Sequence, residues 1–478
     1  MRSIFVCIIC AALGVSTYAQ ECSIFATNTS YANKHIKIQS INNFICNEPT
    51  TIFETEVNKL GIINITVDNI NTPTPAYINA GQNKVLVYLE PNTTLNLVLP
   101  NYEDLTLIQS KNPYFQATEV WAKVILPKKS LTDFVMKADI RYATVMAEYF
   151  EDLKYEYSDS LMNVATSIIL DTEDADTKFK KDYLQYRKYM LEYALKPHKW
   201  QEFMRKYLNT ELLINNSSFT SMLDEVFRNH IDAEISKNRD FISILNESKF
   251  SSIAPYIKDK YQLNENTASL IAIKTIYNGY YLNHFNRPKC IEAAKYLSMN
   301  TKNTELRKIA TETYEKIYHL SINSPAPKIE LKDIYGEKIS LGDFDKSKML
   351  IIHFTDIDLY TAKQEIGYLN TMTVGMDDFL ETLYLFKPGN SPDSIANFVK
   401  QYDIRGQFAV CTDNIATKYR VASWPTTYLL NESNRLIASP APNPMGGLDR
   451  TLKEIVKKKQ IDKMRQEGKE PQNNSFKF

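Results

Sequence analysis

The spacing of apolar residues changes twice along this chain, and each spacing belongs to a different kind of structure. From residue 23 to about residue 99, apolar and polar residues alternate, most clearly at 35–38, 63–67, 85–89 and 95–99. Alternation is the pattern of a β-strand that buries one face. It predicts a small antiparallel β-sandwich, to which we assign residues 20–112.

The second segment repeats its apolar residues every three or four positions instead. One stripe consists of Tyr142, Val145, Met146, Tyr149 and Leu153, and another of Leu270, Ile273, Ile276, Tyr277 and Tyr280. This is the spacing of an amphipathic helix. It predicts an α-helical middle domain over residues 113–322.

Tyrosines occupy the same helical spacing within the middle domain, at Tyr183, Tyr186, Tyr189 and Tyr193. Two interpretations are open for them. Their rings form either a surface that binds sugars or peptides, or a packing face between helices with the hydroxyl groups at the surface.

In the third segment, apolar runs of strand length alternate with runs of helical spacing. The predicted order is strand 348–354, helix 360–371, strand 381–386, helix 391–402, strand 407–411, helix 413–420, strand 426–431, strand 435–439 and a closing helix after Gly447. This order predicts a mixed sheet with helices on both faces over residues 323–460. The chain as a whole is expected to be a multidomain α+β protein that ends in a polar tail, residues 461–478.

Short sequences in the chain resemble a known family. Residues 326–333 (APKIELKD), followed by Gly336 and 339–341 (ISL), are similar to the beginning of an extracytoplasmic thioredoxin-like domain of the TlpA/peroxiredoxin-related kind. Residues 423–430 (SWPTTYLL) resemble the loop of that family in which a cis-proline opens a central strand and faces the active-site turn. Residues 88–92 (YLEPN) resemble the β-domain that precedes such domains in exported Bacteroidetes proteins. The resemblance implies a thioredoxin-like fold for residues 323–460.

The cysteine pair of this family is absent. Aligning Phe354 and Glu365 with the family pattern puts Leu359 and Ala362 where the two cysteines are expected. Thiol–disulfide exchange needs a thiolate and a second thiol that resolves the mixed disulfide, so this turn is a degenerate active site with no catalytic residue. The alternative is a thiol–disulfide oxidoreductase or peroxidase that uses a remaining thiol, Cys411 or Cys290.

The resemblance also implies a binding groove that needs no thiol, because the family binds extended peptides through the main chain beside the cis-proline. The residues expected to form the groove are Trp424, Pro425, Thr426 and Tyr360. Trp424 either adds contact area for a ligand or packs over the turn at Leu359 and Tyr360. The leading hypothesis is therefore a non-catalytic protein that binds a polypeptide or a protein of the cell envelope, and a purely structural envelope protein is a further alternative.

His353, Asp356 and Asp358 flank the same turn and raise the question of a metal site or an acid–base pair. The competing interpretation is a histidine at a strand end beside a solvated turn with a helix N-cap, where aspartate is favoured. The second interpretation needs no further ligands, and we expect neither a metal nor a cofactor.

The amino-terminal sequence predicts export. A basic residue, Arg2, precedes the apolar residues 4–14, and Ala19 is a small residue at a cleavable position, so residues 1–19 are read as a signal peptide. The protein is expected in the periplasm or cell envelope, and lipid attachment is disfavoured because Glu21 precedes Cys22. In that oxidising compartment the simplest pairing is a Cys22–Cys46 disulfide.

Charge and hydropathy exclude two classes of partner. Lysine and arginine number 56, as do aspartate and glutamate, so no general attraction to nucleic acid is expected. Beyond the signal peptide the sequence contains no uninterrupted apolar run of about 18 residues, so no membrane span is expected either.

Overall fold

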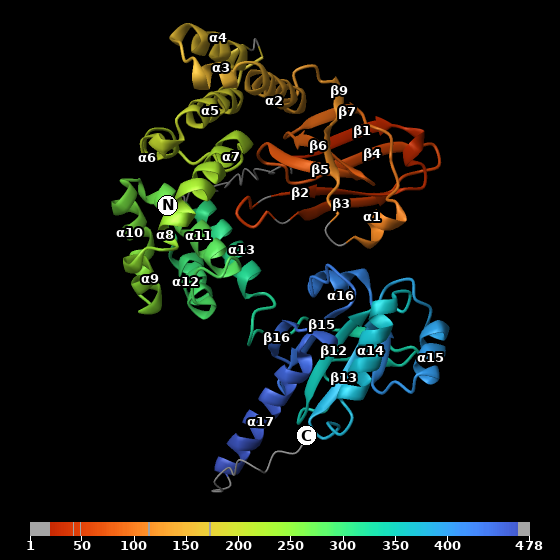
Figure 1. Cartoon of the computed structure of the whole chain (residues 1–478). Helices are drawn as coiled ribbons and strands as arrows, with labels where there is room; N and C mark the ends of the chain where they lie inside the picture. The colour runs from red at the N-terminus through yellow and green to blue at the C-terminus, as the bar shows by residue number, and fades with distance from the viewer. Residues whose placement is uncertain (1–19, 42, 48, 113–114, 172–173, 467–478) are drawn as a thin grey trace, which may run out of the picture. The chain divides into compact units, whose positions relative to one another are not determined.

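The computed structural model describes residues 20–41, 43–47, 49–112, 115–171 and 174–466 (Figure 1). The predicted signal peptide and the last part of the predicted tail, residues 467–478, lie outside the described residues. The chain divides into two compact units. Unit 1 comprises Met1–Leu107 and Gln116–Thr313, and unit 2 comprises Ile108–Phe115 and Tyr314–Phe478.

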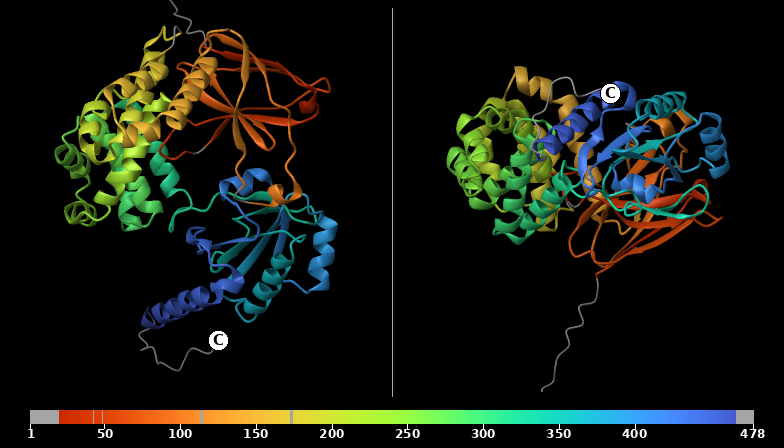
Figure 2. Two further views of the ribbon diagram at one scale, coloured as in Figure 1. Left: turned by 45° about the horizontal axis from the view of Figure 1, so that its top comes forward. Right: turned by 90° about the horizontal axis from the view of Figure 1, so that it is seen from below.

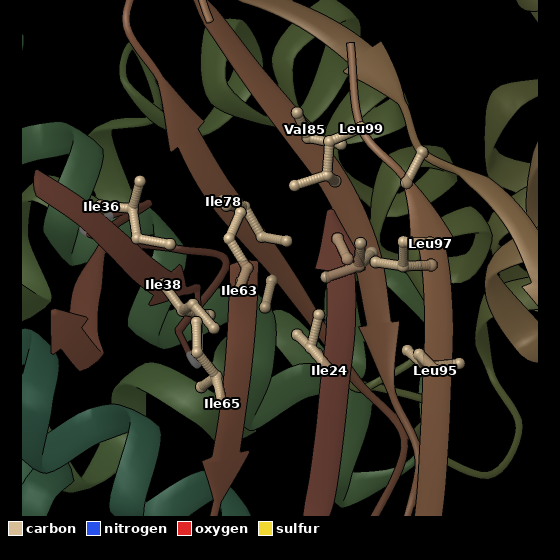
Figure 3. Close-up of a cluster of buried hydrophobic side chains, with 14 of the residues drawn as sticks. Ile24, Ile36, Ile38, Ile63, Ile65, Ile78, Val85, Leu95, Leu97 and Leu99 are labelled. Atoms are coloured by element: carbon tan, nitrogen blue, oxygen red, sulfur yellow. The ribbon is translucent and has the colours of Figure 1, made fainter. Parts of the chain in front are cut away.

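Unit 1 contains two β-sheets. The four-stranded sheet has the order β4 (Ile62–Val67), β1 (Cys22–Thr27), β7 (Thr93–Val98) and β9 (Lys123–Leu126). The five-stranded sheet has the order β3 (Thr50–Glu56), β2 (His35–Ser40), β5 (Thr74–Ala80), β6 (Asn83–Leu89) and β8 (Thr118–Trp121). Figure 3 shows how isoleucine, leucine and valine side chains from both sheets, such as Ile24 and Ile78, form one core. Strands such as β1, β4 and β7 contribute every second residue, which is why the alternation was visible in the sequence.

Two features of these sheets differ from the prediction. The sheets are mixed rather than antiparallel, because β1 pairs in parallel with β7 and β6 pairs in parallel with β8. Alternation fixes which face of a strand is buried but not the direction of its neighbour, so the pattern could not distinguish the two. In addition, β8 and β9 follow the predicted boundary at residue 112 and complete the two sheets.

The predicted disulfide between Cys22 and Cys46 is not formed. Cys22 is a free thiol buried in the core between the sheets, and burial raises its pKa to about 11. Cys46 lies in the turn after β2, with its Sγ atom 3.6 Å from Thr313 Oγ1. The prediction rested on closeness in sequence, whereas the two side chains lie in different surroundings. Cys290 and Cys411 are also free and buried.

The remainder of unit 1 is helical, with helices that begin after a capping side chain. The helices are α2 (Leu131–Glu148), α3 (Phe150–Tyr155), α4 (Asp159–Leu170), α5 (Lys178–Leu195), α6 (Trp200–Phe203), α7 (Ser217–Val226), α8 (Asp232–Ile235), α9 (Arg239–Asn246), α10 (Ile253–Tyr261), α11 (Glu265–Tyr281), α12 (Arg287–Asn300) and α13 (Thr304–Tyr318). Ser130, Ser158, Thr177 and Asn264 each accept a hydrogen bond from a first-turn N–H group, which explains where α2, α4, α5 and α11 start. Two π-helical turns, η3 (Met204–Leu208) and η4 (Phe227–Ile231), continue α6 and α7.

The structure decides between the two interpretations for most of the tyrosine stripe. Tyr183, Tyr186 and Tyr193 are buried, so they serve mainly as packing residues. Their hydroxyl groups are not at the surface as expected, since Tyr183 donates to Asp139 at 2.8 Å and Tyr186 donates to the carbonyl oxygen of Tyr207 at 2.8 Å. Tyr189 differs from the others because it is only half-buried.

Unit 2 is built around a five-stranded sheet with the order β14 (Gln407–Val410), β13 (Leu380–Phe386), β12 (Met349–Thr355), β15 (Thr426–Leu430) and β16 (Leu436–Ala441). The first three strands are parallel, and β15 and β16 are antiparallel to their neighbours. The helices are α14 (Tyr360–Met372), α15 (Pro392–Gln401), α16 (Asp413–Lys418) and α17 (Leu448–Gln466), and a hairpin of β10 (Glu330–Lys332) and β11 (Lys338–Ser340) precedes the sheet. Figure 2 gives two further views of these elements, coloured teal to blue.

Each face of this sheet has its own core. Residues of α14, α15 and α17 pack on one face, around Ile351 and Tyr384. Residues of α16 and β11 pack on the other face, around Ile352 and Phe354. The predicted mixed sheet with helices on both faces is confirmed, and the bounds of its elements agree with the prediction to within about two residues. None of the helices among the described residues is both long enough and apolar enough to cross a bilayer.

We expect dithiothreitol to leave the melting temperature of the protein unchanged, because Cys22 is a buried thiol rather than half of a disulfide. Cys22→Ser should lower the free energy of unfolding by about 1–3 kcal/mol, since a hydroxyl group is placed in an apolar core. Cys22→Val serves as the apolar control in the same thermal and urea unfolding measurements. A fall of several degrees on reduction, or a Cys22–Cys46 peptide in a non-reducing digest, would contradict this account.

Candidate functional site

The residues predicted to form a groove lie where the strand β12 ends. The peptide bond between Trp424 and Pro425 is cis, and Pro425 directly precedes β15. Because Thr426 pairs with Phe354 in the antiparallel register of β12 and β15, Pro425 lies opposite the end of β12. At this point the chain leaves β12, turns, and enters α14. The register therefore brings the cis-proline loop and the degenerate turn to the same edge of the sheet.

Leu359 and Ala362 occupy the start of α14. Leu359 is the N-cap residue, with an extended backbone and no side-chain hydrogen bond to the helix, and Ala362 is fully buried. Tyr360 is the first helical residue and is 75% exposed. A helix N-terminus is where a cysteine thiol becomes acidic enough to react. The start of α14 is thus a position that suits a reactive thiol, but Leu359 and Ala362 are aliphatic there.

The remaining cysteines do not replace the missing pair. Cys411 is buried at the end of β14, where burial raises the pKa of its thiol to about 12. Burial likewise raises the pKa of Cys290 to about 12. A thiol with such a pKa is almost entirely protonated at neutral pH and is a poor nucleophile.

His353 is a buried, neutral residue in the interior of β12 rather than at its end. Its Nδ1 atom lies 3.0 Å from Thr427 Oγ1, and its ring meets the edge of Tyr384 with 5.9 Å between ring centroids. Burial lowers the pKa of His353 to about 3. Its Nε2 atom and the hydroxyl group of Tyr384 have no hydrogen-bond partner among the described residues.

The competing interpretation expected Asp356 to lie in a solvated turn. Instead, Asp356 is buried and its side chain organises the turn. It is only 3% exposed, and its Oδ1 atom accepts from the backbone N–H of Asp358 at 3.0 Å and from Asn390 Nδ2 at 3.3 Å. Its Oδ2 atom lies 3.6 Å from Lys387 Nζ. Within the described ranges of the chain, no three His, Cys, Asp or Glu residues are grouped so that they could hold a metal ion.

Glu365 and Tyr384 are polar residues at this site that the sequence reasoning did not identify as functional. Glu365 faces inward from α14 with Ala362 and Ile366, and its Oε2 atom has no hydrogen-bond partner in the described part of the chain. Burial raises its pKa above the ordinary value. The sequence contained one sign of this site, because Glu365 is a carboxylate at a core-facing position of the predicted helix 360–371. Neither residue supplies a thiol or a metal ligand set.

Trp424 is half-buried at the lip of the cis-proline loop. Its ring packs edge-to-face on Phe354, with 5.9 Å between ring centroids. Thr426 Oγ1 donates to the carbonyl oxygen of Ser423 and thereby closes the loop around the proline. Among the described residues, neither the N–H nor the C=O group of Trp424 forms a hydrogen bond. Trp424, Pro425 and Thr426 thus lie in one loop, in which the main-chain N–H and C=O groups of Trp424 are not hydrogen-bonded among the described residues.

Comparisons with known proteins place this chain near thioredoxin-fold structures over part of its length. No protein-family model and no curated protein matches it. Similar solved structures include a thiol:disulfide interchange protein from Bacteroides sp., at 17% identity over 29% of this chain and 92% of the other, with a TM-score of 0.26. They also include the thioredoxin domain of a thiol-disulfide oxidoreductase from Bacteroides vulgatus, at 16% identity over 28% and 98% of the two chains, with a TM-score of 0.26. A thiol-disulfide oxidoreductase from Bacteroides fragilis matches at 19% identity over 28% and 99%, with a TM-score of 0.24.

The wild-type protein should not reduce insulin disulfides, whereas Leu359→Cys combined with Ala362→Cys should form an intramolecular disulfide and gain reductase activity. The reason is that the two substitutions place a thiol pair at a helix start that lies at the same end of the sheet as the cis-proline loop. Each single substitution serves as a control, because one thiol cannot resolve a mixed disulfide. Reductase activity in the wild type, or a folded double variant that stays fully reduced under air, would contradict this interpretation of the turn.

Lowering the pH should destabilise the protein through His353. Its pKa in the folded state, about 3, lies below the ordinary value near 6.5. Between these two pH values the unfolded state therefore binds more protons than the folded state. The contribution of neutral His353 to the free energy of unfolding is complete above pH ~6.5 and falls by up to about 1.4 kcal/mol per pH unit below it. Urea unfolding at pH 7 and pH 5 should show a loss that is about 2 kcal/mol smaller in His353→Asn than in the wild type. Equal losses in the two proteins would rule out His353 as the titrating group.

Proposed function

We propose that unit 2 is a binding module that uses no thiol and holds an extended polypeptide segment at the cis-proline loop, in a protein exported to the periplasm or cell envelope. One observation carries this proposal. At the same end of the sheet, Leu359 and Ala362 provide no thiol, and the main-chain groups of Trp424 have no hydrogen-bond partner among the described residues. An extended peptide binds such a main-chain segment by β-strand-like hydrogen bonds, which need no thiol.

The side chains around the loop favour a polypeptide over a small charged ligand. Trp424 and Tyr360 supply aromatic surface, and the exposed carboxylate of Asp358 lies in the intervening turn. Because Trp424 also packs on Phe354, its ring is held in place before a ligand arrives. A pre-positioned aromatic residue loses little conformational entropy on binding, which is how aromatic anchors contribute strongly to affinity.

The competing function is a thiol oxidoreductase or peroxidase that uses Cys411 or Cys290. Burial and the raised pKa of both thiols argue against it. Such an enzyme would also need a second thiol within reach of the first.

We expect the full-length mature protein to bind reduced and carboxymethylated α-lactalbumin, a permanently unfolded polypeptide, in a fluorescence anisotropy titration. Trp424→Ala should weaken this binding by about tenfold or more, as is common for truncated aromatic anchors. Tyr335→Ala is the matched control, because Tyr335 is an aromatic residue of the same unit that is 75% exposed. Equal losses in both variants, or a Trp424→Ala protein that binds normally, would contradict a groove centred on Trp424.

A further inference from the structure

Two small hollows adjoin the half-buried Tyr207 in the helical part of unit 1. One has a volume of about 250 Å³ and lies between α5 and residues 206–213. The other has a volume of about 270 Å³ and lies between the end of α5, α6 and Tyr157. Lys206 and Tyr207 line both hollows. Neither hollow has a part in the function proposed for unit 2.

The backbone positions Tyr207 in an unusual way. Tyr207 belongs to the π-helical turn η3, and such turns occur frequently at functional sites. Its ring stacks on Tyr189, with 3.7 Å between ring centroids and 25° between ring planes, and its hydroxyl group donates to Glu192 Oε2 at 3.0 Å. Tyr189 is the residue of the tyrosine stripe that did not become part of a buried core. The two rings therefore form a fixed stacked pair, and Lys206 Nζ lies over the Tyr207 ring, 4.8 Å from its centroid.

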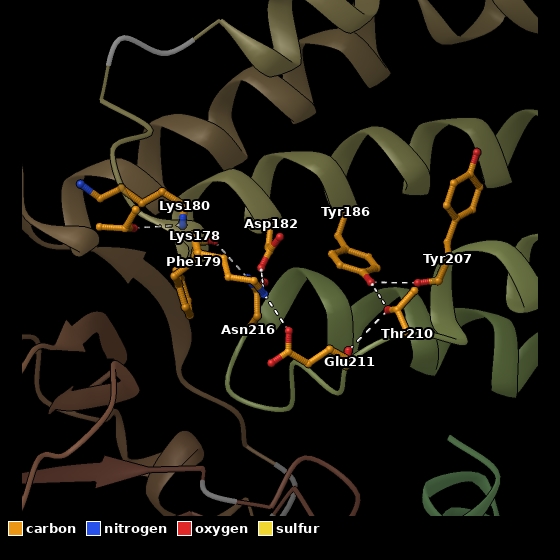
Figure 4. A network of polar contacts seen from close by, with 10 residues as sticks. Lys178, Phe179, Lys180, Asp182, Tyr186, Tyr207, Thr210, Glu211 and Asn216 are labelled. Carbon is orange, nitrogen blue, oxygen red and sulfur yellow. Dashed lines mark hydrogen bonds and ion pairs between the residues drawn. The ribbon is translucent and has the colours of Figure 1, made fainter. Parts of the chain in front are cut away.

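Polar groups around the first hollow are also held in place, as Figure 4 shows. The hydroxyl group of Tyr186 donates to the carbonyl oxygen of Tyr207 and lies 3.3 Å from Thr210 Oγ1. Lys178 Nζ lies 3.1 Å from Asp182 Oδ2 and 2.9 Å from Glu211 Oε2. The hydrogen bonds to these two carboxylates raise the pKa of Lys178, which keeps its ammonium group charged.

Taken together, the charges of the two hollows balance, which restricts the class of ligand. Lys178, Asp182 and Glu211 line the first hollow, Lys196, Lys199, Glu192 and Glu202 line the second, and Lys206 lines both, so four lysines face four carboxylates. Such a surface attracts neither anions nor cations in particular, but it offers several hydrogen-bond donors and acceptors beside aromatic rings. A neutral ligand rich in hydroxyl groups matches this combination.

The sizes of the hollows point to a ligand made of linked units. Each hollow is smaller than the roughly 300 Å³ at which ordinary small-molecule pockets begin. We propose that unit 1 binds a neutral oligosaccharide across Tyr207, with one sugar unit in each hollow. The apolar face of a sugar ring packs on the Tyr189–Tyr207 pair after displacing the exposed Lys206 side chain, and the hydroxyl groups bond to the paired lysine and carboxylate side chains.

Isothermal titration calorimetry of the full-length mature protein with maltohexaose, cellohexaose, xylohexaose and laminarihexaose tests this proposal. At least one of these sugars should bind with a Kd below about 1 mM, and Tyr207→Ala should weaken binding at least tenfold. Tyr155→Ala, which removes another exposed tyrosine of unit 1, should bind like the wild type. Binding should also be equal at low and high salt, because the ligand is neutral.

A second variant keeps the test informative if Tyr207→Ala is unstable. Glu211→Gln removes one acceptor charge from an exposed side chain and should weaken sugar binding several-fold without changing the melting temperature. Absence of binding by all four sugars would overturn the proposal, as would binding that neither substitution affects. Binding that weakens steeply with salt would overturn it too, since it would indicate a charged ligand.

Discussion

Burial of β12 on both faces is the constraint on which the arrangement of unit 2 depends. Every residue from Met349 to Thr355 is buried, with Ile351 in one core and Ile352 and Phe354 in the other. A strand with two buried faces must be central, and its partners β13 and β15 are fixed by its register. The end of β12 therefore determines both where α14 starts and where the cis-proline loop lies.

Side chains and main chain have separate parts at this end of the sheet. Leu359 and Ala362 at the start of α14 supply no thiol, whereas the unpaired main-chain groups of Trp424 belong to the loop before β15. His353, in the interior of β12, is buried and neutral.

The sequence predicted the order and the bounds of the unit 2 elements well because its strands are long apolar runs separated by turn residues. It predicted the cis peptide bond before Pro425 through a short motif, which depends only on local sequence. It did not predict the parallel pairing of β1 with β7, because partner choice is a long-range property. Nor did it identify Tyr207. This residue does not continue the three- and four-residue spacing of the tyrosine stripe, and its ring stacks on Tyr189 from the π-helical turn η3.

The most direct test of a thiol-free binding groove is hydrogen–deuterium exchange of the full-length protein with and without carboxymethylated α-lactalbumin. The account predicts that protection on binding is concentrated in residues 422–426 and 357–361, and that intact mass spectra show no covalent adduct. Protection confined to other parts of the chain, or a mixed disulfide formed with an unmodified polypeptide, would contradict it.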